Sequence, residues 1–97
     1  MNAFIKLGVI EPLAQALYPQ GIRFPTVIQQ ASIPAIFKGK DIIGRSETGT
    51  GKTLAYLLPL VQRVDVKKGG TQVLIMTPTR ELAKQIFDVL RPFAILM

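Results

Sequence analysis

The stretch SETGTGKT, residues 46–53, decides how the rest of this sequence is interpreted. It follows a short apolar run at Asp41–Gly44, which we predict to be a strand, and it precedes an apolar run at Leu54–Val64, which we predict to be a helix. A glycine-rich stretch between a strand and a helix is the setting of a phosphate-binding loop, or P-loop. The pattern is G-x-x-x-x-G-K-T, with the small residue Ser46 in place of the first glycine. The alternative is an ordinary glycine-rich turn with a surface lysine.

The chemistry of the P-loop stretch suits a nucleoside triphosphate. Gly49 and Gly51 let backbone amides point into one concavity, with no side chain where phosphate oxygens approach. Lys52 brings a positive charge to the β and γ phosphates, and the Thr53 hydroxyl is a ligand for Mg²⁺. We therefore predict that a nucleoside triphosphate and Mg²⁺ bind here, with Lys52 and Thr53 as the catalytic residues and Thr53 as the metal ligand. The predicted phosphate-binding residues are Ser46, Thr48, Gly49, Thr50, Gly51, Lys52 and Thr53.

The remaining pattern alternates helical and strand-like segments. A short helix is predicted at Glu11–Leu17, and a second is predicted over residues 26–39, from a Thr N-cap to a closing glycine. The continuously apolar run Gln72–Thr77 is typical of a strand buried on both faces of a parallel sheet. Apolar residues then recur at helical spacing between Thr79 and Arg91. The predicted fold is α/β, with parallel strands flanked by helices.

Composition excludes several kinds of chemistry and favours others. The sequence has no cysteine and no histidine, which excludes disulfides, Cys/His zinc sites, catalytic thiols and histidine-based acid–base schemes. Twelve Lys and Arg against six Asp and Glu give a net charge of +6, which indicates anionic partners such as nucleotides or nucleic acid, or serves solubility alone. No secretory signal and no apolar run long enough for a bilayer is found, so we expect a cytoplasmic protein without a membrane partner.

Two further motifs lie on either side of the P-loop. The first is GIRFPTVIQ at Gly21–Gln29, and the second is PTRELA at Pro78–Ala83. In this order the three stretches resemble the Q motif, motif I and motif Ia of the DEAD-box ATP-dependent RNA helicases, and PTRELA matches motif Ia letter for letter. Phe4 also lies seventeen residues before Gly21, where that family has an aromatic residue. The resemblance implies that residues 1–97 are the truncated N-terminal part of a RecA-like P-loop NTPase domain.

The resemblance also implies how adenine is bound. The Q-motif glutamine reads adenine in the family, so Gln29 would accept a hydrogen bond from the exocyclic amine and donate one to the adjacent ring nitrogen. Phe4 would stack on the base, and Thr26 would tie the Q motif to the P-loop. The structural alternatives are core packing for Phe4 and helix capping for Thr26. Ile22 stands where the family usually has an aromatic residue, and Val27 where it frequently has proline. These departures bear on how the segment packs and leave the assignment of Gln29 unchanged.

Motif Ia in the family contacts the sugar-phosphate backbone of single-stranded RNA. The residues that would do so here are Pro78, Thr79 and Arg80, with a solvated helix start as the alternative. The family's DEAD sequence, which holds Mg²⁺ for hydrolysis, does not occur in this chain, and neither does a second RecA-like domain. We therefore expect a chain that binds ATP and RNA, is inactive alone, and has the missing C-terminal helicase portion as its partner. The alternatives are a non-enzymatic nucleotide-binding product and part of another P-loop NTPase such as a DNA helicase.

Overall fold

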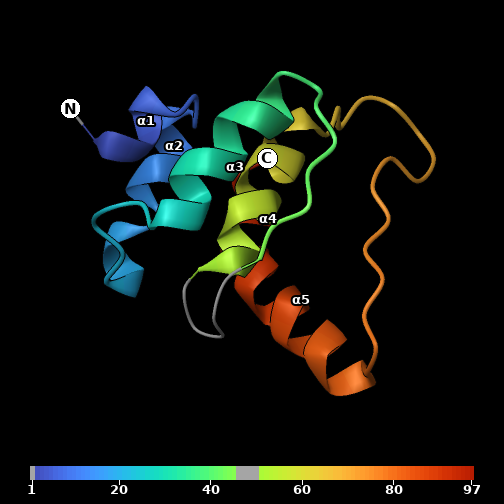
Figure 1. Cartoon of the computed structure of the whole chain (residues 1–97). Coiled ribbons are helices and arrows are strands. Elements are labelled where there is room, and N and C mark those ends of the chain that lie inside the picture. The colour runs from blue at the N-terminus through green and yellow to red at the C-terminus, as the bar shows by residue number, and fades with distance from the viewer. Residues whose placement is uncertain (1, 46–50) are drawn as a thin grey trace.

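The computed structural model describes residues 2–45 and 51–97, and within these residues the secondary structure is entirely helical (Figure 1). The elements in chain order are α1 (Ala3–Lys6), α2 (Glu11–Gln15), the 3₁₀ helix η1 (Tyr18–Gln20), α3 (Val27–Phe37), α4 (Lys52–Arg63) and α5 (Arg80–Ala94). Helices α3 and α4 pack side by side in the middle of the molecule. Helices α1 and α2 lie on one side of this pair, and α5 packs against α4 on the other side (Figure 1).

The start of α3 confirms the predicted capping box. The backbone N–H of Gln29 donates to the Thr26 hydroxyl over 3.3 Å, and the Thr26 N–H donates back to the Gln29 side-chain oxygen over 3.0 Å. These two bonds satisfy backbone donors that the first turn of a helix leaves without partners. The helix ends at Phe37, two residues before Gly39, whose φ of 79° is left-handed and therefore suits glycine.

Helix α5 extends further than its sequence pattern predicted. Thr79 is its N-cap, and the Thr79 hydroxyl accepts a hydrogen bond of 3.1 Å from the backbone N–H of Leu82. Rather than ending at Arg91, the helix continues through Pro92 to Ala94. The reason is packing, because this last turn places Phe93 in the core, where only 1% of its surface is exposed. Burying a phenylalanine offsets the cost of a proline near the end of a helix.

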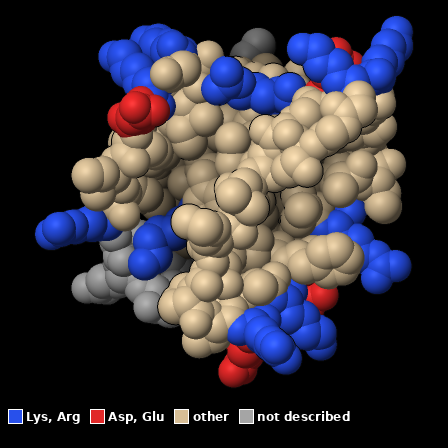
Figure 2. Space-filling model, turned by 90° about the vertical axis from the view of Figure 1, so that its right-hand side faces the viewer, with Lys and Arg blue, Asp and Glu red and all other residues tan. Residues whose placement is uncertain are grey.

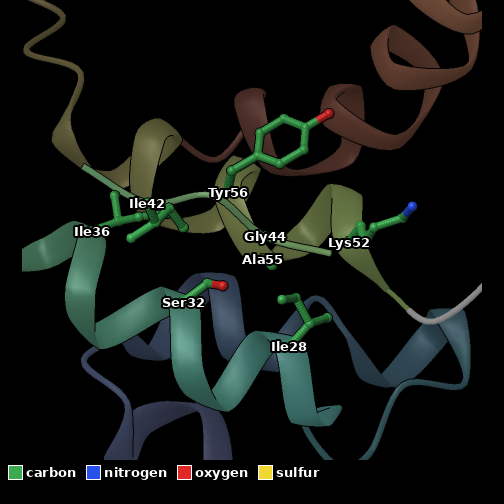
Figure 3. A pocket seen from close by; sticks show the side chains of 8 residues that line it. All are labelled: Ile28, Ser32, Ile36, Ile42, Gly44, Lys52, Ala55 and Tyr56. Atoms are coloured by element: carbon green, nitrogen blue, oxygen red, sulfur yellow. The ribbon is translucent and has the colours of Figure 1, made fainter. Parts of the chain in front are cut away.

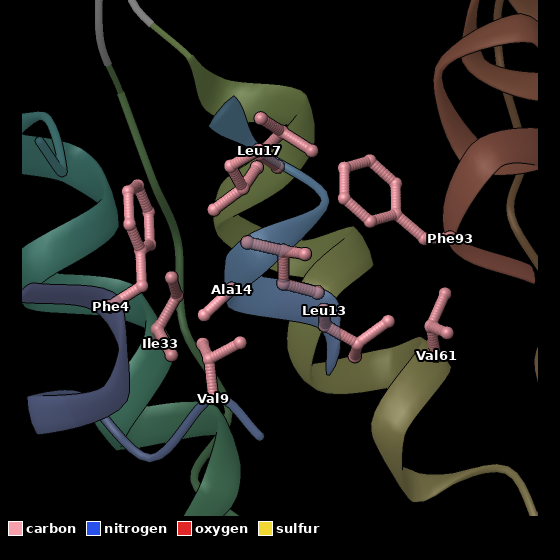
Figure 4. Close-up of a cluster of buried hydrophobic side chains, with 10 residues drawn as sticks. Phe4, Val9, Leu13, Ala14, Leu17, Ile33, Val61 and Phe93 are labelled. Atoms are coloured by element: carbon pink, nitrogen blue, oxygen red, sulfur yellow. The ribbon is translucent and has the colours of Figure 1, made fainter. Parts of the chain in front are cut away.

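The main core lies where α1, α2, α3, α4 and the end of α5 meet, and Figure 4 shows Phe93 pointing into it from α5. A polar contact also fastens the N-terminal helices to α4. The Gln62 side chain donates to the Gly8 carbonyl over 3.0 Å and accepts from the Ile10 N–H over 2.9 Å. The core residues are Phe4, Val9, Leu13, Ala14, Leu17, Ile33, Leu54, Leu58, Val61 and Phe93.

The two predicted strands, Asp41–Gly44 and Gln72–Thr77, are not strands within the described residues. Both segments are extended, but residues 41–45 and 71–77 make no backbone hydrogen bond to any other described residue. An extended segment becomes a strand only when its N–H and C=O groups pair with a neighbour. The two segments run apart from each other in Figure 1, so they do not supply that neighbour to one another.

The run Gln72–Thr77 is covered on one face only, which corrects the prediction of burial on both faces. Val73 and Ile75 are half-buried and line a small apolar cavity of about 90 Å³ against α4 and α5. Leu74 and Met76 alternate with them and are exposed, as the period of two in extended backbone requires. Figure 2 views the molecule from this side and shows a broad uncharged middle with Lys and Arg around it.

Truncating Phe93 tests whether α5 belongs to the core. Phe93→Ala is expected to lower the free energy of unfolding by about 3–5 kcal/mol, because large-to-small changes in a core leave a cavity. Phe87→Ala is the matched control, since Phe87 lies on the same helix and is 58% exposed; it should change stability little. Urea denaturation followed by circular dichroism measures both. Equal effects of the two substitutions would show that α5 does not pack as described.

The exposed side of the Gln72–Thr77 segment, which carries Leu74 and Met76, predicts self-association of this chain. Exposed apolar surface and unpaired extended backbone both promote contact between copies. Leu74→Lys combined with Met76→Lys should shift sedimentation toward the monomer, because charge at these exposed positions opposes burial. Gln15→Lys combined with Gln20→Lys, at exposed positions on another part of the molecule, is the control for net charge. A wild-type chain that sediments as a sharp monomer would contradict the prediction.

Candidate nucleotide site

The candidate site begins where the N-terminus of α3 meets the N-terminus of α4. The Gln29 side chain is buried, with 2% of its surface exposed, and it joins the two helices. Its oxygen accepts from the Thr26 N–H, and its nitrogen donates to the Gly51 carbonyl over 3.1 Å. The Gln29 amide therefore holds the Q-motif segment, residues 21–29, against the last glycine of the P-loop stretch. The Thr26 methyl group lies close to Gly51, since a β-carbon added there would be 3.2 Å from it.

Gly51 is required here for two separate reasons. Its φ of 85° is left-handed, a conformation that costs other residues energy. A β-carbon at this position would also clash with the Gln29 side-chain nitrogen and would lie 3.2 Å from the Thr26 methyl group. Residue 51 must therefore be glycine if the Gln29 amide is to reach its carbonyl.

Lys52 and Thr53, the predicted catalytic residues, form the first turn of α4. Lys52 is exposed and Thr53 is half-buried. Together with Gly51 they line an open cleft of about 500 Å³ between the start of α4 and helix α5. The other residues that line this cleft are Tyr56, Leu82, Gln85 and Ile86. The cleft thus combines a helix N-terminus with a positive charge and a hydroxyl, a combination that attracts phosphate.

A second cavity, of about 260 Å³, lies between α3 and α4 on the other side of this turn. Figure 3 shows it lined mainly by apolar side chains, with the Lys52 ammonium group pointing away from them. Since the Lys52 ammonium group points away from this mainly apolar lining, the larger cleft is the better candidate for the nucleotide. The lining residues are Ile28, Ser32, Ile36, Ile42, Gly44, Lys52, Ala55 and Tyr56.

Sequence reasoning identified part of the cleft and missed the rest. Tyr56 follows Lys52 by four residues, a spacing that places both side chains on one side of α4. This spacing could have identified Tyr56 as a residue of the cleft. Gln85 has no such signal, because only the packing of α5 against α4 brings it to the cleft. The predicted phosphate-binding residues Ser46, Thr48, Gly49 and Thr50 lie outside the described residues.

Phe4 occupies the core rather than a surface. It has no exposed area and packs within the same cluster as Val9, Leu13 and Ile33 (Figure 4). This is the core-packing alternative that the sequence left open. Stacking of Phe4 on adenine, as the family resemblance implied, would require the side chain to leave the core.

The predicted RNA-binding residues lie at the start of α5. Pro78 and Arg80 are exposed, while the Thr79 hydroxyl caps the helix. The Thr77 hydroxyl donates to the Thr79 carbonyl over 2.7 Å, which holds the turn into the helix. The structure brings Leu82 of the PTRELA stretch to the cleft beside Lys52, so this stretch and the first turn of α4 contribute to one cleft.

A family model described as DEAD/DEAH box helicase matches residues 26–96. The chain therefore belongs to the DEAD/DEAH box helicase family. It is 44% identical over 93 residues to the RNA helicase CrhR of Synechocystis sp., and 46% identical over 92 residues to DEAD-box ATP-dependent RNA helicase 16 of Arabidopsis thaliana. These matches take in 96% and 89% of the chain, but only 19% and 15% of the two relatives.

Solved structures show the same likeness. The chain matches S. cerevisiae Dbp5 bound to RNA and ADP BeF3 with a TM-score of 0.90 and 28% identity, over 100% of this chain and 25% of that one. It matches a DEAD box protein from Methanococcus jannaschii with a TM-score of 0.86 and 32% identity, over 95% of this chain and 25% of the other. The fold is thus that of part of a RecA-like DEAD-box helicase domain. None of the helices in the described residues has the length and apolar character to span a membrane.

Gly51→Ala separates the two reasons for glycine at this position. Gly39 is the matched control, because it has a similar positive φ of 79° but no atom within 4 Å of an added β-carbon. Gly39→Ala should therefore cost only the backbone strain, about 1–2 kcal/mol. Gly51→Ala should cost more, because the Gln29 amide must also move, and Gln29→Ala should recover part of the difference. Equal costs in urea denaturation would argue against the contact between Gln29 and Gly51.

Proposed function

We propose that this chain is the ATP-binding and RNA-binding part of the first RecA-like domain of a DEAD-box ATP-dependent RNA helicase. The observation that carries the proposal is the hydrogen bond from the Gln29 amide to the Gly51 carbonyl. This bond supports the proposal because it joins Gln29, the residue proposed to read adenine, to the start of the turn that would hold the phosphates. Family membership and the likeness to a helicase solved with RNA and a nucleotide support the same conclusion.

Selectivity for adenine follows from the bonding capacity that Gln29 has left. A side-chain amide has two acceptor lone pairs and two donor hydrogens. In Gln29, one lone pair is used by the Thr26 N–H and one hydrogen by the Gly51 carbonyl. One acceptor and one donor remain, which is the pair needed for the amine of adenine and its neighbouring ring nitrogen. Guanine has a carbonyl oxygen, an acceptor, where adenine has its amine, so guanine would leave the Gln29 acceptor unpaired.

Phosphate binding is assigned to the first turn of α4. Lys52 is exposed and lines the cleft, where it can reach an anion, and the helix N-terminus adds its partial positive charge. The half-buried Thr53 hydroxyl is a hard oxygen ligand of the kind Mg²⁺ takes, so its chemistry fits a metal ion shared with the phosphates. When bound, Mg²⁺ neutralises charge between the β and γ phosphates.

RNA binding is assigned to the turn into α5. Pro78 and Arg80 are exposed there, and Arg80 begins a helix whose N-terminal amides favour an anion. Such contacts reach the sugar-phosphate backbone and carry no sequence information. The net charge of +6 supports association with a polyanion.

We further propose that Asp41–Gly44 and Gln72–Thr77 are strands of a parallel sheet in the complete domain, with residues 1–97 forming one unit of a cytoplasmic protein. Their extended backbone and the half-buried face of Val73 and Ile75 support this. The chain has no Asp-Glu-Ala-Asp sequence, so it lacks the carboxylate that positions Mg²⁺ and water for hydrolysis. By itself it is expected to bind ATP without turnover.

Competition binding of ATP and GTP to three variants tests the proposal. Lys52→Ala should weaken both nucleotides by about tenfold or more, because a hydrogen bond to a charged group contributes about 1.5–3 kcal/mol. Gln29→Ala should instead narrow the preference for ATP over GTP. Lys40→Ala, at an exposed lysine outside the cleft, is the control and should change neither. ATP binding that survives Lys52→Ala undiminished would refute the assignment.

A further inference from the structure

The end of the α3–α4 pair that lies opposite the candidate nucleotide site carries a concentration of positive charge. Helices α3 and α4 run in the same direction, because the Gln29 contact joins their N-termini and the Arg63 guanidinium donates to the Ile36 carbonyl over 3.2 Å near their C-termini. At 1.5 Å per residue, α3 separates the two ends by about 16 Å. The exposed basic residues at this end, which we call the basic surface, are Lys38, Arg63, Lys67 and Lys68.

Helix stability explains only part of this charge. Lys38 is the C-cap of α3 and Arg63 is the last residue of α4, where a positive charge interacts favourably with the helix dipole. That effect falls off within the last turn of a helix, so it does not account for Lys67 and Lys68. Acidic residues do not cancel the charge, because residues 38–41 and 63–72 together contain five Lys or Arg and two Asp. Their net charge of +3 is half that of the whole chain.

The loop that carries Lys67 and Lys68 is fixed by the Gln72 side chain. The side-chain oxygen of Gln72 accepts from the Asp65 N–H over 2.9 Å, and its nitrogen donates to the carbonyls of Asp65 and Lys68 over 2.7 and 3.3 Å. The Asp65 carboxylate accepts from the Lys67 N–H over 3.0 Å, so it is directed at the backbone of its own loop. Two adjacent lysines are therefore presented from a fixed loop, and ordering this loop on a ligand costs little further entropy.

Arg63 connects this loop to the end of α3 and retains the capacity to bind an anion. One of its N–H groups donates to the Ile36 carbonyl, and a guanidinium has five such donors. Arg63 also lines, with Gln72, an open hollow of about 340 Å³. Figure 1 shows the end of α3 and the loop after α4 at the top of the molecule and the start of α5 at the bottom, and Figure 2 shows Lys and Arg along the top edge. The basic surface is thus separate from Arg80.

We propose that the basic surface binds the phosphate backbone of double-stranded RNA. Neither residues 38–41 nor residues 63–72 include an aromatic residue, whereas proteins that bind single strands stack the bases on aromatic rings. Duplex RNA is recognised instead by its shape, through contacts to phosphates and 2′-hydroxyls, and exposed cations on a fixed loop can supply such contacts. This site goes beyond the proposed function, which assigns RNA binding to the turn into α5 alone.

Binding of a blunt-ended RNA duplex, followed by fluorescence anisotropy over a series of salt concentrations, tests the proposal. Lys67→Ala combined with Lys68→Ala should weaken the duplex about tenfold and reduce the slope of log affinity against log salt by about 2, since two phosphate contacts are lost. Arg23→Ala combined with Lys84→Ala removes the same charge from exposed positions elsewhere, and as the control it should change both quantities little. Equal losses in the two double variants would overturn the proposal, because net charge alone would then explain them.

Gln72→Ala tests the fixed loop with no change in charge. It should weaken binding of the duplex, because Lys67 and Lys68 would then be ordered only when the duplex binds. Gln15→Ala, at an exposed glutamine of α2, is the control and should not. If these two variants bind the duplex equally, the loop is not the binding element and the proposal is overturned.

Two further ligands separate this site from the RNA contact proposed for α5. Arg80→Ala should weaken binding of unpaired single-stranded RNA more than binding of the duplex, whereas the change of Lys67 and Lys68 should do the reverse. If Arg80→Ala has no effect on the single strand while the duplex still depends on the two lysines, the assignment to α5 is wrong and the basic surface stands. If polyglutamate displaces the labelled duplex as well as unlabelled duplex does, the surface binds acidic protein segments and the RNA proposal is overturned.

Discussion

The buried amide of Gln29 is the contact on which the candidate site depends. One side chain caps α3 through Thr26 and reaches the Gly51 carbonyl at the start of α4. A buried amide that lost either partner would leave a polar group unpaired, which costs about 1–3 kcal/mol. The atoms proposed to read the base therefore also fix the position of the first turn of α4, so the proposed recognition of base and of phosphate would share one structural element.

This shared element explains why two glycines with similar backbone angles have different roles. Gly39 ends α3 in open space, and its requirement is conformational. Gly51 has a left-handed φ and also has the Gln29 amide in the position of the missing side chain. Both positions are glycine in the sequence, which by itself does not show that their roles differ. Only the packing of α3 against α4 distinguishes a residue needed for its backbone from one needed for its lack of volume.

Local features were predictable from the sequence, and non-local ones were not. The Thr26 capping box and the helix after the P-loop stretch were confirmed, because capping and helical periodicity depend on near neighbours. The predicted end of α5 at Arg91 was wrong, because burial of Phe93 outweighed the local signal from Pro92. The two strands were not found because apolar runs indicate extended backbone, whereas strand formation needs a partner segment. Gln85 reached the cleft through tertiary packing alone.

The pair of hydrogen bonds made by Gln62 has a consequence for the order of folding. These two bonds close a loop of more than fifty residues, from Gly8 and Ile10 to α4. Closing so long a loop costs chain entropy before any contact repays it. Helices α3 and α4, whose partners are closer in sequence, are therefore expected to associate first, with the N-terminal segment docking onto them afterwards. On that pathway, Phe4 and the other core residues of the N-terminal segment pack last, against helices α3 and α4 that have already associated.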